Sequence, residues 1–455
     1  MSVSIKDINS SFIDKELIIY GRVHKIRTTG KMCFIVLRDQ INSIQCIISK
    51  SNKELFSRCS QILTESFLEL KGILRKLPDD IPKINFTSHK DFEFTILDII
   101  NLIKSTEDLP FALDDVNQLY LENDRNNVLL NTRLNNRPFD LRVPFNNCIF
   151  KIQSSVCRYF REFLYEQDFI EIHSPKTIGT PSEGGAAVFE LKYFNSPAFL
   201  AQSPQLYKQM CINADFNKVF EIGPVFRAEN CISHRHLCEF TGLDIEMALT
   251  PGETYYEIIE IFWSTLVNVF KKLNGNNKKE LYYIKSYHKF DDLKFSEEPF
   301  ILEFKEGVKM LQESGNDQSM DDDLSSVNEK KLGDLVKEKF GYDIFVLDKY
   351  PSKVRPFYTM PSGDLYSNSY DVIMRGQEIS SGSQRQHDYE KLLSALKERD
   401  MNPLLLKDYL DSFKYGSRPH GGCGFGLERI VMLYLDLENV RETSLFPRDP
   451  ARVTP

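Results

Sequence analysis

Two neighbouring stretches near the middle of the chain, FEIGPVFRAE and HRHLCEFTGLDIEM, hold residue types that could do chemistry. In an extended chain Phe240, Asp244 and Glu246 share one face with a glycine between them, and apolar residues take the other face. Such a face indicates the floor of a polar site. Arg227 offers a planar, permanently charged fork for phosphate or carboxylate. Arg227 and Glu229 could otherwise be an ordinary surface pair.

A second segment, AQSPQLYK, has the pattern of a helix start with polar side chains on one side. Ser203 suits the N-cap and Pro204 the first helical position. Gln205 and Lys208, three residues apart, then lie on the same side of the first turn. Simple capping with an exposed lysine would explain this segment equally well.

Three further segments could contribute to the same site. Asp371 and Glu378, in SYDVIMRGQEISSGSQRQHD, are candidate ligands for a hard cation such as Mg²⁺, and Arg385 follows them. GGCGFGLER opens a helix with glycines that allow close approach of the backbone to a ligand. It lacks GK[ST], so it is not a P-loop. TPSEGGAAVF carries one carboxylate, Glu183, and means little by itself.

The elements that position these residues fall into two regions. Before residue 104 the strand-like runs ELIIYGRVHKIR, KMCFIVLRD, SIQCIIS, SFLELKGILRK and DFEFTILDI, with a helix near 52–63 after the third, predict a small Greek-key barrel of the OB type. Residues 104–136 are rich in Asp, Asn and Leu and are expected to form a hinge or linker.

The region 137–455 mixes helices and strands. Apolar residues from Ile152 to Leu164 repeat at helical spacing and predict an amphipathic helix. Strand-like runs follow at 198–203, 218–228 and 238–249, with helices at 253–273 and over GLERIVMLYLDL. Residues 314–326 are polar and acidic and predict a solvated loop. Together these patterns predict an α+β domain with an antiparallel sheet.

Composition limits the classes of protein that the chain can represent. Its 455 residues are 42% hydrophobic and carry a formal net charge of −8. Residues 1–110 hold 16 Lys and Arg against 14 Asp and Glu, so any contact with nucleic acid is expected to be local and in this first region. The nine cysteines form no CxxC pair, which favours free thiols in a reducing cytosol. No apolar run reaches the ~18 residues of a membrane span.

Taken together, these segments resemble a known family. SPKTIG, FRAE followed by HRHLCEFTGLD, and GFGLER resemble motifs 1, 2 and 3 of class II aminoacyl-tRNA synthetases, and an OB-type domain ahead of the catalytic domain is typical of subclass IIb. Within that subclass, PSEGGA, QSPQ, EFTGLDIEM and SLFPRDP resemble the aspartyl enzymes of eukaryotes and archaea. The similarity covers nearly the whole chain.

The resemblance implies a role for each matching residue. The expected catalytic residues are Arg227, Glu229 and Arg429. The expected ATP-binding residues are Arg227, Glu229, Arg235, His236, Leu237, Phe240, Glu378, Gly426, Leu427, Glu428 and Arg429. The expected aspartate-binding residues are Glu183, Ser203, Gln205, Lys208, Arg227, Asp244, Ser381 and Arg385. The expected Mg²⁺ ligands are Asp371, Glu378 and Ser381; the expected anticodon-binding residues are Phe34, Gln45 and Glu93; Pro175 belongs to a dimer-interface motif.

The activity that this resemblance implies is aspartate–tRNA ligation in the cytoplasm by a homodimer with no membrane partner. L-aspartate and ATP would form aspartyl-adenylate, and tRNA(Asp) would accept the aspartyl group on its terminal ribose 3′-hydroxyl. Three alternatives remain open from the residues: an enzyme that also charges tRNA(Asn), an amidating enzyme that makes asparagine, and a catalytically inactive relative that binds RNA or regulates a partner. Phe34 could also be an ordinary core residue of the barrel, and Glu93 a solvated charge.

Overall fold

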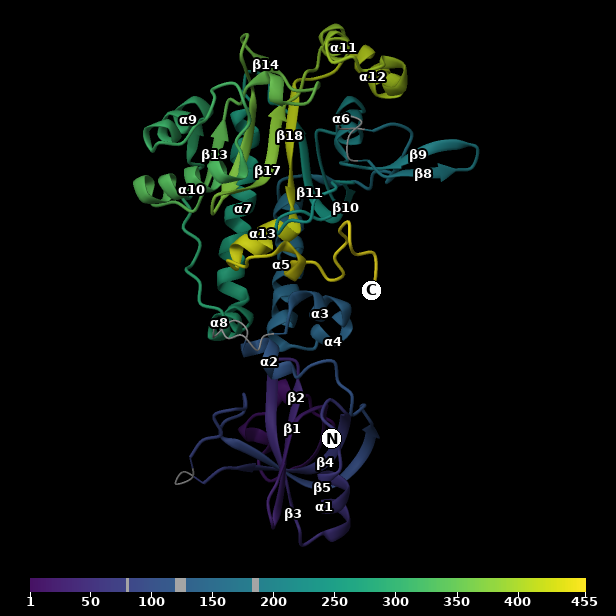
Figure 1. Cartoon of the computed structure of the whole chain (residues 1–455), viewed down its shortest axis with the longest axis vertical. Coiled ribbons are helices and arrows are strands. Elements are labelled where there is room, and N and C mark those ends of the chain that lie inside the picture. The colour runs from purple at the N-terminus through teal and green to yellow at the C-terminus, as the bar shows by residue number, and fades with distance from the viewer. Residues whose placement is uncertain (79–81, 119–127, 182–187) are drawn as a thin grey trace. The chain divides into compact units, whose positions relative to one another are not determined.

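The computed structural model describes residues 1–78, 82–118, 128–181 and 188–455, and it divides into two compact units, Met1–Asn147 and Cys148–Pro455 (Figure 1). The predicted domain boundaries at 103/104 and 136/137 stay a prediction. Within the expected hinge, two short helices form, α2 (Leu113–Gln118) and α3 (Leu130–Asn135). Within the described part of the chain, no helix combines the length and the apolar character needed to cross a bilayer.

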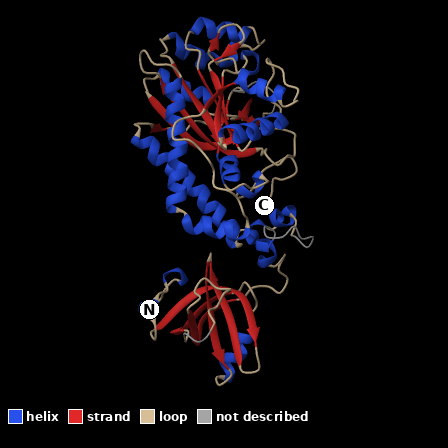
Figure 2. Ribbon diagram, turned by 90° about the vertical axis from the view of Figure 1, so that its left-hand side faces the viewer, coloured by secondary structure: helices blue, strands red, loops and turns tan. Residues whose placement is uncertain are grey.

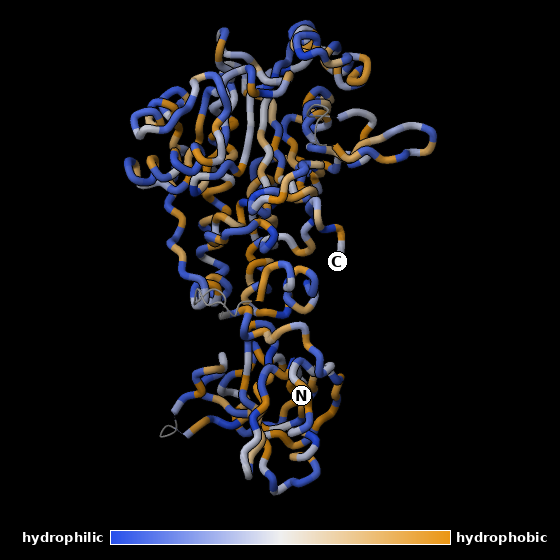
Figure 3. The backbone as a smooth tube through the Cα atoms, in the orientation of Figure 1, coloured by the Kyte–Doolittle hydropathy of each residue, from blue (hydrophilic) through white to orange (hydrophobic). Residues whose placement is uncertain are grey.

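The first unit contains the predicted OB-type barrel. Five strands close in the order β1-β2-β3-β5-β4, and α1 follows the third strand as expected. Alternate residues of each strand face inward and form an apolar core, which the tube coloured by hydropathy shows as orange segments among blue ones (Figure 3). The strands are β1 (Glu16–Thr28), β2 (Met32–Asp39), β3 (Asn42–Ser49), β4 (Phe67–Lys76) and β5 (Phe92–Ile103), and the helix is α1 (Lys53–Ser60).

The second unit is built on an eight-stranded sheet in the order β12-β13-β16-β17-β18-β11-β10-β6. All neighbouring strands pair antiparallel except β12 with β13 and β10 with β6. This confirms the predicted α+β class. The strands are β6 (Ile170–Glu171), β10 (Lys218–Phe226), β11 (Glu239–Ala248), β12 (Ile301–Glu303), β13 (Ile344–Asp348), β16 (Ser369–Met374), β17 (Gln377–Gln384) and β18 (His420–Gly426).

Helices flank this sheet (Figure 2). The predicted amphipathic helix is α5 (Pro144–Glu166). Lys272 of its neighbour α7 (Tyr256–Asn276) donates to Glu162 of α5, and Tyr159 of α5 donates to Asn277, which directly follows α7. The other helices of this unit are α6 (Gln205–Asn213), α8 (Lys278–Tyr287), α9 (Phe304–Glu313), α10 (Ser326–Phe340), α11 (Tyr389–Lys397), α12 (Lys407–Lys414) and α13 (Leu427–Tyr434), whereas α4 (Arg137–Asp140) belongs to the first unit.

Two small sheets and one loop complete the unit. Strand β9 (Ser196–Leu200) pairs with β7 (Thr177–Ile178) and β8 (Glu190–Tyr193), and β14 (Pro361–Ser362) pairs with β15 (Tyr366–Ser367). The acidic segment 314–326 is a loop as predicted up to Ser325, and Ser326 begins α10, but the loop is not fully solvated. Gln318 is buried and its amide donates to three carbonyls of the same segment, so the loop is internally hydrogen-bonded.

Candidate active site

The floor of the candidate site is the strand triplet β10-β11-β18. Gly424 lies opposite Asp244 and Gly422 opposite Glu246 across the β11–β18 pair. A Cβ atom on Gly424 would lie 2.8 Å from Oδ1 of Asp244, and one on Gly422 would lie 2.4 Å from Oε2 of Glu246. The glycine-rich run therefore makes room for two carboxylates of the neighbouring strand, a close approach that only glycine allows.

Above this floor lies a cavity of about 350 Å³. The structure brings most of the predicted residues to its wall. The predicted residues that line it are Ser203, Gln205, Arg227, Glu229, Arg235, His236, Leu237, Phe240, Asp244, Glu378, Ser381, Arg385, Gly426, Glu428 and Arg429. Lys208, Asp371 and Leu427 are buried outside that wall, and Glu183 lies outside the described residues.

One end of the cavity is bounded by a buried network of four charges. Arg385 binds Glu246 through Nε–Oε1 at 2.8 Å and Nη2–Oε2 at 3.1 Å. The Nζ of Lys208 lies 2.9 Å from Oδ1 of Asp244 and 3.5 Å from Oε2 of Glu246. Lys208 and Arg385 therefore both contact Glu246, and the expected grip of both cations on a substrate carboxylate stays a prediction. Lys208 is fully buried, which excludes the exposed lysine that its segment also allowed.

Glu246 is the member of this network that was not predicted as a site residue from the sequence. Its side chain is fully buried and contacts both cations and the amide of Gln205 at 3.3 Å. Arg385 and Lys208 lower the pKa of Glu246 despite the opposing effect of burial, which is the largest single influence on it. The signal that could have identified it is its place on the polar face of β11, beside Asp244.

The other end of the cavity holds aromatic and guanidinium groups. The Arg227 guanidinium lies 5.6 Å from the centre of the Phe240 ring, a cation–π distance. Arg429 donates to the carbonyls of Glu378 at 2.7 Å and Arg235 at 2.9 Å, so it joins β17 to the loop between β10 and β11. A planar ring facing fixed cations can hold a nucleotide base beside its phosphates.

The loop between β10 and β11 carries a short polar chain. The Nε2 of His236 lies 3.7 Å from Glu229, and its Nδ1 lies 2.6 Å from the Ser233 hydroxyl. Burial is the largest cause of the lowered pKa of His236, so the ring is neutral near pH 7. Cys231 is exposed beside it at 3.6 Å, and all nine cysteines are free thiols.

Glu428 stabilises β11, the central strand of the site's floor. Its carboxylate accepts two contacts from the backbone N–H of Thr241, at 3.0 and 3.2 Å, so it fixes β11 to the start of α13. Burial raises the pKa of Glu428 to about 7, because the charged form has lost most of its water.

The expected magnesium ligands lie together at the sheet. Asp371 in β16 is the register partner of Ser381 in β17, and a bulge between Glu378 and Ser380 interrupts the same pair. Burial and the charge of Asp371 raise the pKa of Glu378 to about 7. Two carboxylates and a hydroxyl are hard oxygen donors, and Mg²⁺ is commonly held by one or two carboxylates with water and phosphate. The donor chemistry therefore fits Mg²⁺, although the described residues hold no cluster of three His, Cys, Asp or Glu side chains for a metal.

Arg355 is a further wall residue that the sequence patterns do not single out. It binds Asp371 with both ends of its guanidinium, at 3.0 and 2.8 Å, and stacks 3.7 Å above the ring of Tyr350. It stands in no motif quoted above, and no local periodicity marks it. Arg355 reaches Asp371 because β16 pairs with β17 and because the segment 352–355, a short 3-10 helix and its C-cap, lies beside them.

The three residues predicted to bind an anticodon lie on the barrel. Phe34 in β2 is half-buried, points away from the apolar core, and has the Arg27 guanidinium 4.9 Å from its ring centre. Gln45 in β3 is the register partner of Glu93 in β5, and the Gln45 amide donates to the Glu93 carboxylate. An outward ring beside a cation can stack on an unpaired base.

Comparisons with known proteins agree with this arrangement. Residues 130–450 match the family of class II tRNA synthetases (D, K and N), and residues 17–102 match the OB-fold nucleic acid binding domain. The cytoplasmic aspartate–tRNA ligase of Rattus norvegicus is 45% identical over all of this chain and 91% of the relative, and that of Caenorhabditis elegans is 43% identical over all of this chain and 87% of the relative.

Solved structures similar to this chain are also tRNA synthetases for aspartate and asparagine. The aspartyl tRNA synthetase from Entamoeba histolytica superposes with a TM-score of 0.90 at 41% identity, covering 100% of this chain and 93% of that one. The asparaginyl-tRNA synthetase from Pyrococcus horikoshii, complexed with asparaginyl-adenylate, gives a TM-score of 0.86 at 27% identity over both whole chains. By sequence, fold and site geometry, this chain belongs to the class II tRNA synthetases and, within them, to the aspartate–tRNA ligases.

Proposed function

We propose that this chain activates L-aspartate with ATP and transfers the aspartyl group to the 3′-hydroxyl of the terminal ribose of tRNA(Asp), releasing AMP and pyrophosphate. The observation that carries the substrate assignment is a buried pair of cations: Arg385 lines the cavity together with Arg227, Phe240 and Arg429, and Lys208 is buried behind its wall. We place this activity in the cytoplasm, in accord with the names of its relatives.

Aspartate is selected by charge. Arg385 has five N–H donors, and its hydrogen bonds to described residues use four of them, on Glu246, Ser383 and Gln205. One N–H of Nη1 is then left for a ligand carboxylate. The ammonium group of Lys208 donates to three protein oxygens and adds positive charge near Arg385 without itself lining the cavity. Asparagine would leave the arginine N–H facing an uncharged amide. Breaking such a buried pair costs about 3–5 kcal/mol, and each ~1.4 kcal/mol is tenfold in affinity.

The acidic side of the pocket suits the substrate ammonium group. Asp244 lines the cavity, and the Ser203 hydroxyl and the Gln205 side chain lie on the same wall. The amide of Gln205 is held by Arg385 at 3.0 Å and Glu246 at 3.3 Å, so its orientation is fixed before substrate arrives. Fixed polar groups lower the reorganisation needed for binding.

The first step needs orientation and positive charge more than a base. The substrate α-carboxylate is already ionised at neutral pH and attacks the α-phosphorus in line with the departing pyrophosphate. Arg227 stands at the cavity wall beside Phe240, where it stabilises negative charge on the α-phosphate, and the ring of Phe240 with Arg429 encloses the adenine. Mg²⁺ held by Asp371, Glu378 and Ser381 would neutralise phosphate charge.

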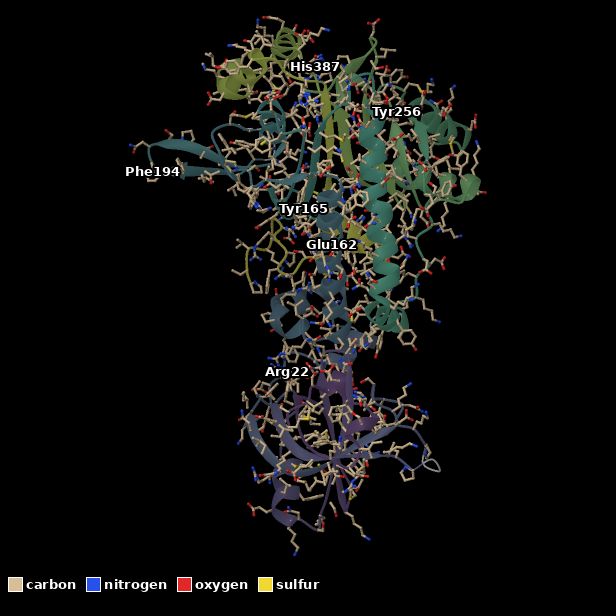
Figure 4. The ribbon with its side chains drawn as sticks, turned by 180° about the vertical axis from the view of Figure 1, so that it is seen from behind. Arg22, Glu162, Tyr165, Phe194, Tyr256 and His387 are labelled. Atoms are coloured by element: carbon tan, nitrogen blue, oxygen red, sulfur yellow. The ribbon has the colours of Figure 1, made fainter. Side chains whose placement is uncertain are left out.

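We further propose that the chain acts as a homodimer through the region of Pro175. Strand β6 is an edge of the main sheet, and Tyr165, Ile170 and Pro175 near it are exposed; Tyr165 is marked on the surface of its helix in Figure 4. An exposed sheet edge with apolar side chains favours association. Light scattering coupled to size exclusion tests this, and a monomer at micromolar concentration would contradict it.

Pyrophosphate exchange with aspartate, asparagine and lysine tests the activation step, followed by charging of tRNA(Asp) and tRNA(Asn). We expect exchange with aspartate alone and charging of tRNA(Asp). Exchange with asparagine at a comparable rate would overturn the charge argument, and charging of both tRNAs would identify an enzyme of relaxed tRNA specificity. An enzyme that makes free asparagine would give exchange without charging either tRNA.

A further inference from the structure

Arg355 occupies the middle of the expected magnesium site. Its Nη1 donates to Asp371 Oδ1 and to Ser381 Oγ, both at 3.0 Å, and its Nη2 donates to Asp371 Oδ2 at 2.8 Å. One guanidinium therefore joins two of the three expected metal ligands. A cation held between Asp371 and Ser381 would have to lie where Nη1 now lies.

The third ligand is left available. The hydrogen bonds that Glu378 forms with described residues use its backbone, from N–H to Glu329 at 3.4 Å and from Arg429 to its carbonyl at 2.7 Å. Its carboxylate lies near Asp371 and feels the negative charge of that group. A divalent cation that entered beside Asp371 would therefore meet the Glu378 carboxylate without a bound cation and the Asp371 carboxylate already bound to Arg355.

The arginine itself is incompletely satisfied in this position. Its Nε is buried and has no hydrogen-bond partner among the described atoms, a condition that Arg375 shares. Buried N–H groups are almost always paired, so an unpaired one calls for an explanation. A side chain that has a second resting position, in which the fork is released from Asp371, provides one. Tyr350, whose ring supports the guanidinium at 3.7 Å, offers a flat surface along which it can shift.

We propose that Arg355 is a positioning residue that holds the place of the divalent cation: without nucleotide it keeps Asp371 and Ser381 in register, and it leaves Asp371 when the cation enters with the triphosphate. The inference rests on the proposed function, because the cation concerned is the one that accompanies ATP. The physical reason is that a guanidinium and a divalent ion ~4 Å apart repel strongly in a poorly hydrated site. Cation binding and release of the arginine are therefore linked.

The opposite arrangement is that Arg355 remains on Asp371 and orients it while the ion uses the other lone pairs, as partners of metal ligands often do. The two arrangements predict opposite effects of removing the arginine. Competition predicts that the cation binds more tightly without it, whereas orientation predicts that the cation binds more weakly.

The experiment measures binding of Mn²⁺, a spectroscopic substitute for Mg²⁺, to the full chain without ATP, by the loss of the free-ion signal in electron paramagnetic resonance. Arg355→Met is compared with the unaltered chain and with Arg375→Met. Arg375 is a matched control, because it is equally buried and pairs with Asp436 at 3.1 Å. We expect Arg355→Met to bind Mn²⁺ about tenfold more tightly or better, and the control to bind as the unaltered chain does. Unchanged or weaker binding by Arg355→Met overturns the proposal.

Two further variants test where the ion binds and whether the result depends on Arg355→Met alone. Glu378→Gln in the Arg355→Met background should remove the gained Mn²⁺ affinity, which places the ion at this site. Should Arg355→Met fail to fold, Arg355→Lys retains a cation that cannot span both Asp371 oxygens, and a smaller gain in Mn²⁺ affinity is expected; no gain contradicts the proposal.

Pyrophosphate exchange by the unaltered chain is measured separately. Its absence refutes the proposed function, whereas exchange together with unchanged Mn²⁺ affinity in the variants refutes this inference alone.

Discussion

Arg385 and Glu246 form a buried two-point ion pair, Nε to Oε1 at 2.8 Å and Nη2 to Oε2 at 3.1 Å, between β17–α11 and the middle of β11. Both side chains are at most 5% exposed, so neither charge has an alternative partner in bulk water. The pair fixes the plane of the guanidinium, and Arg385 is one of the residues that line the cavity.

Replacing Arg385 with Leu should abolish aspartate activation. The variant loses the N–H that meets the substrate and leaves Glu246 buried without its arginine, which turns the pocket negative toward a dicarboxylate. We expect pyrophosphate exchange with aspartate to fall on the order of a thousandfold or more. Arg375→Leu serves as the control for loss of a paired arginine elsewhere in the unit. Near-normal exchange by Arg385→Leu in a folded protein would refute the substrate assignment.

Alanine at Gly424 should weaken aspartate binding more than it weakens the fold. The nearest atoms to the added Cβ belong to the Asp244 side chain, at 2.8 Å, so that carboxylate must move from Lys208. Gly422→Ala is the contrasting variant, because its Cβ would lie 2.0 Å from the backbone oxygen of Ile245. We expect a raised KM for aspartate with a small change in Tm for Gly424→Ala, and a large loss of Tm for Gly422→Ala. Equal effects on both quantities would contradict this account.

Phe34→Ala should separate the two reactions. The ring is half-buried on the outside of the barrel, beside Arg27, and belongs to the first unit, whereas the candidate active site is built from residues of the second unit. Loss of one stacking ring costs about 1–3 kcal/mol of binding to an unpaired base. We therefore expect charging of tRNA(Asp) to show a KM raised on the order of tenfold while pyrophosphate exchange stays unchanged. A parallel loss of exchange would contradict the anticodon role.

His420 should make the fold sensitive to acid. Its ring is fully buried between the Arg418 carbonyl at Nδ1 and the Gln209 amide at Nε2, and burial lowers its pKa to about 4, although the nearby Glu246 opposes that shift. The unfolded chain takes up a proton below about pH 6.5, whereas the folded chain does not until about pH 4. Stability from this group is therefore present above pH 6.5 and falls as the pH drops toward 4.

The measurement is the change in Tm between about pH 7 and pH 5, for the unaltered chain and for His420→Gln. At pH 5 the histidine removes about 2 kcal/mol of stability from the unaltered chain, and the variant lacks this contribution. We expect the Tm of His420→Gln to fall less over this interval. An equal fall in both proteins would show that His420 is already charged in the folded state.

The fold class and the placement of the site could be predicted from local pattern. Alternation in EFTGLDIEM set Phe240, Asp244 and Glu246 on one face of β11, and strand-like runs with a helix after the third set the barrel. Local pattern missed Glu246 as a functional residue because a carboxylate on a polar face looks the same whether it meets substrate or a buried arginine. It missed Arg355 because that residue follows a short 3-10 helix (Ser352–Val354) and lies in no regular strand or α-helix.

The sequence by itself determined which way each side chain points, because strand and helix periodicity is a property of the local backbone. Only the tertiary structure decided which charges meet. Lys208 contacts the carbonyl of Cys423, 215 residues away, and Arg385 contacts Glu246 across 139 residues. These meetings depend on the register of β11 against β18 and β17 against β18, and a shift of one residue would turn Asp244 and Glu246 away from the cations.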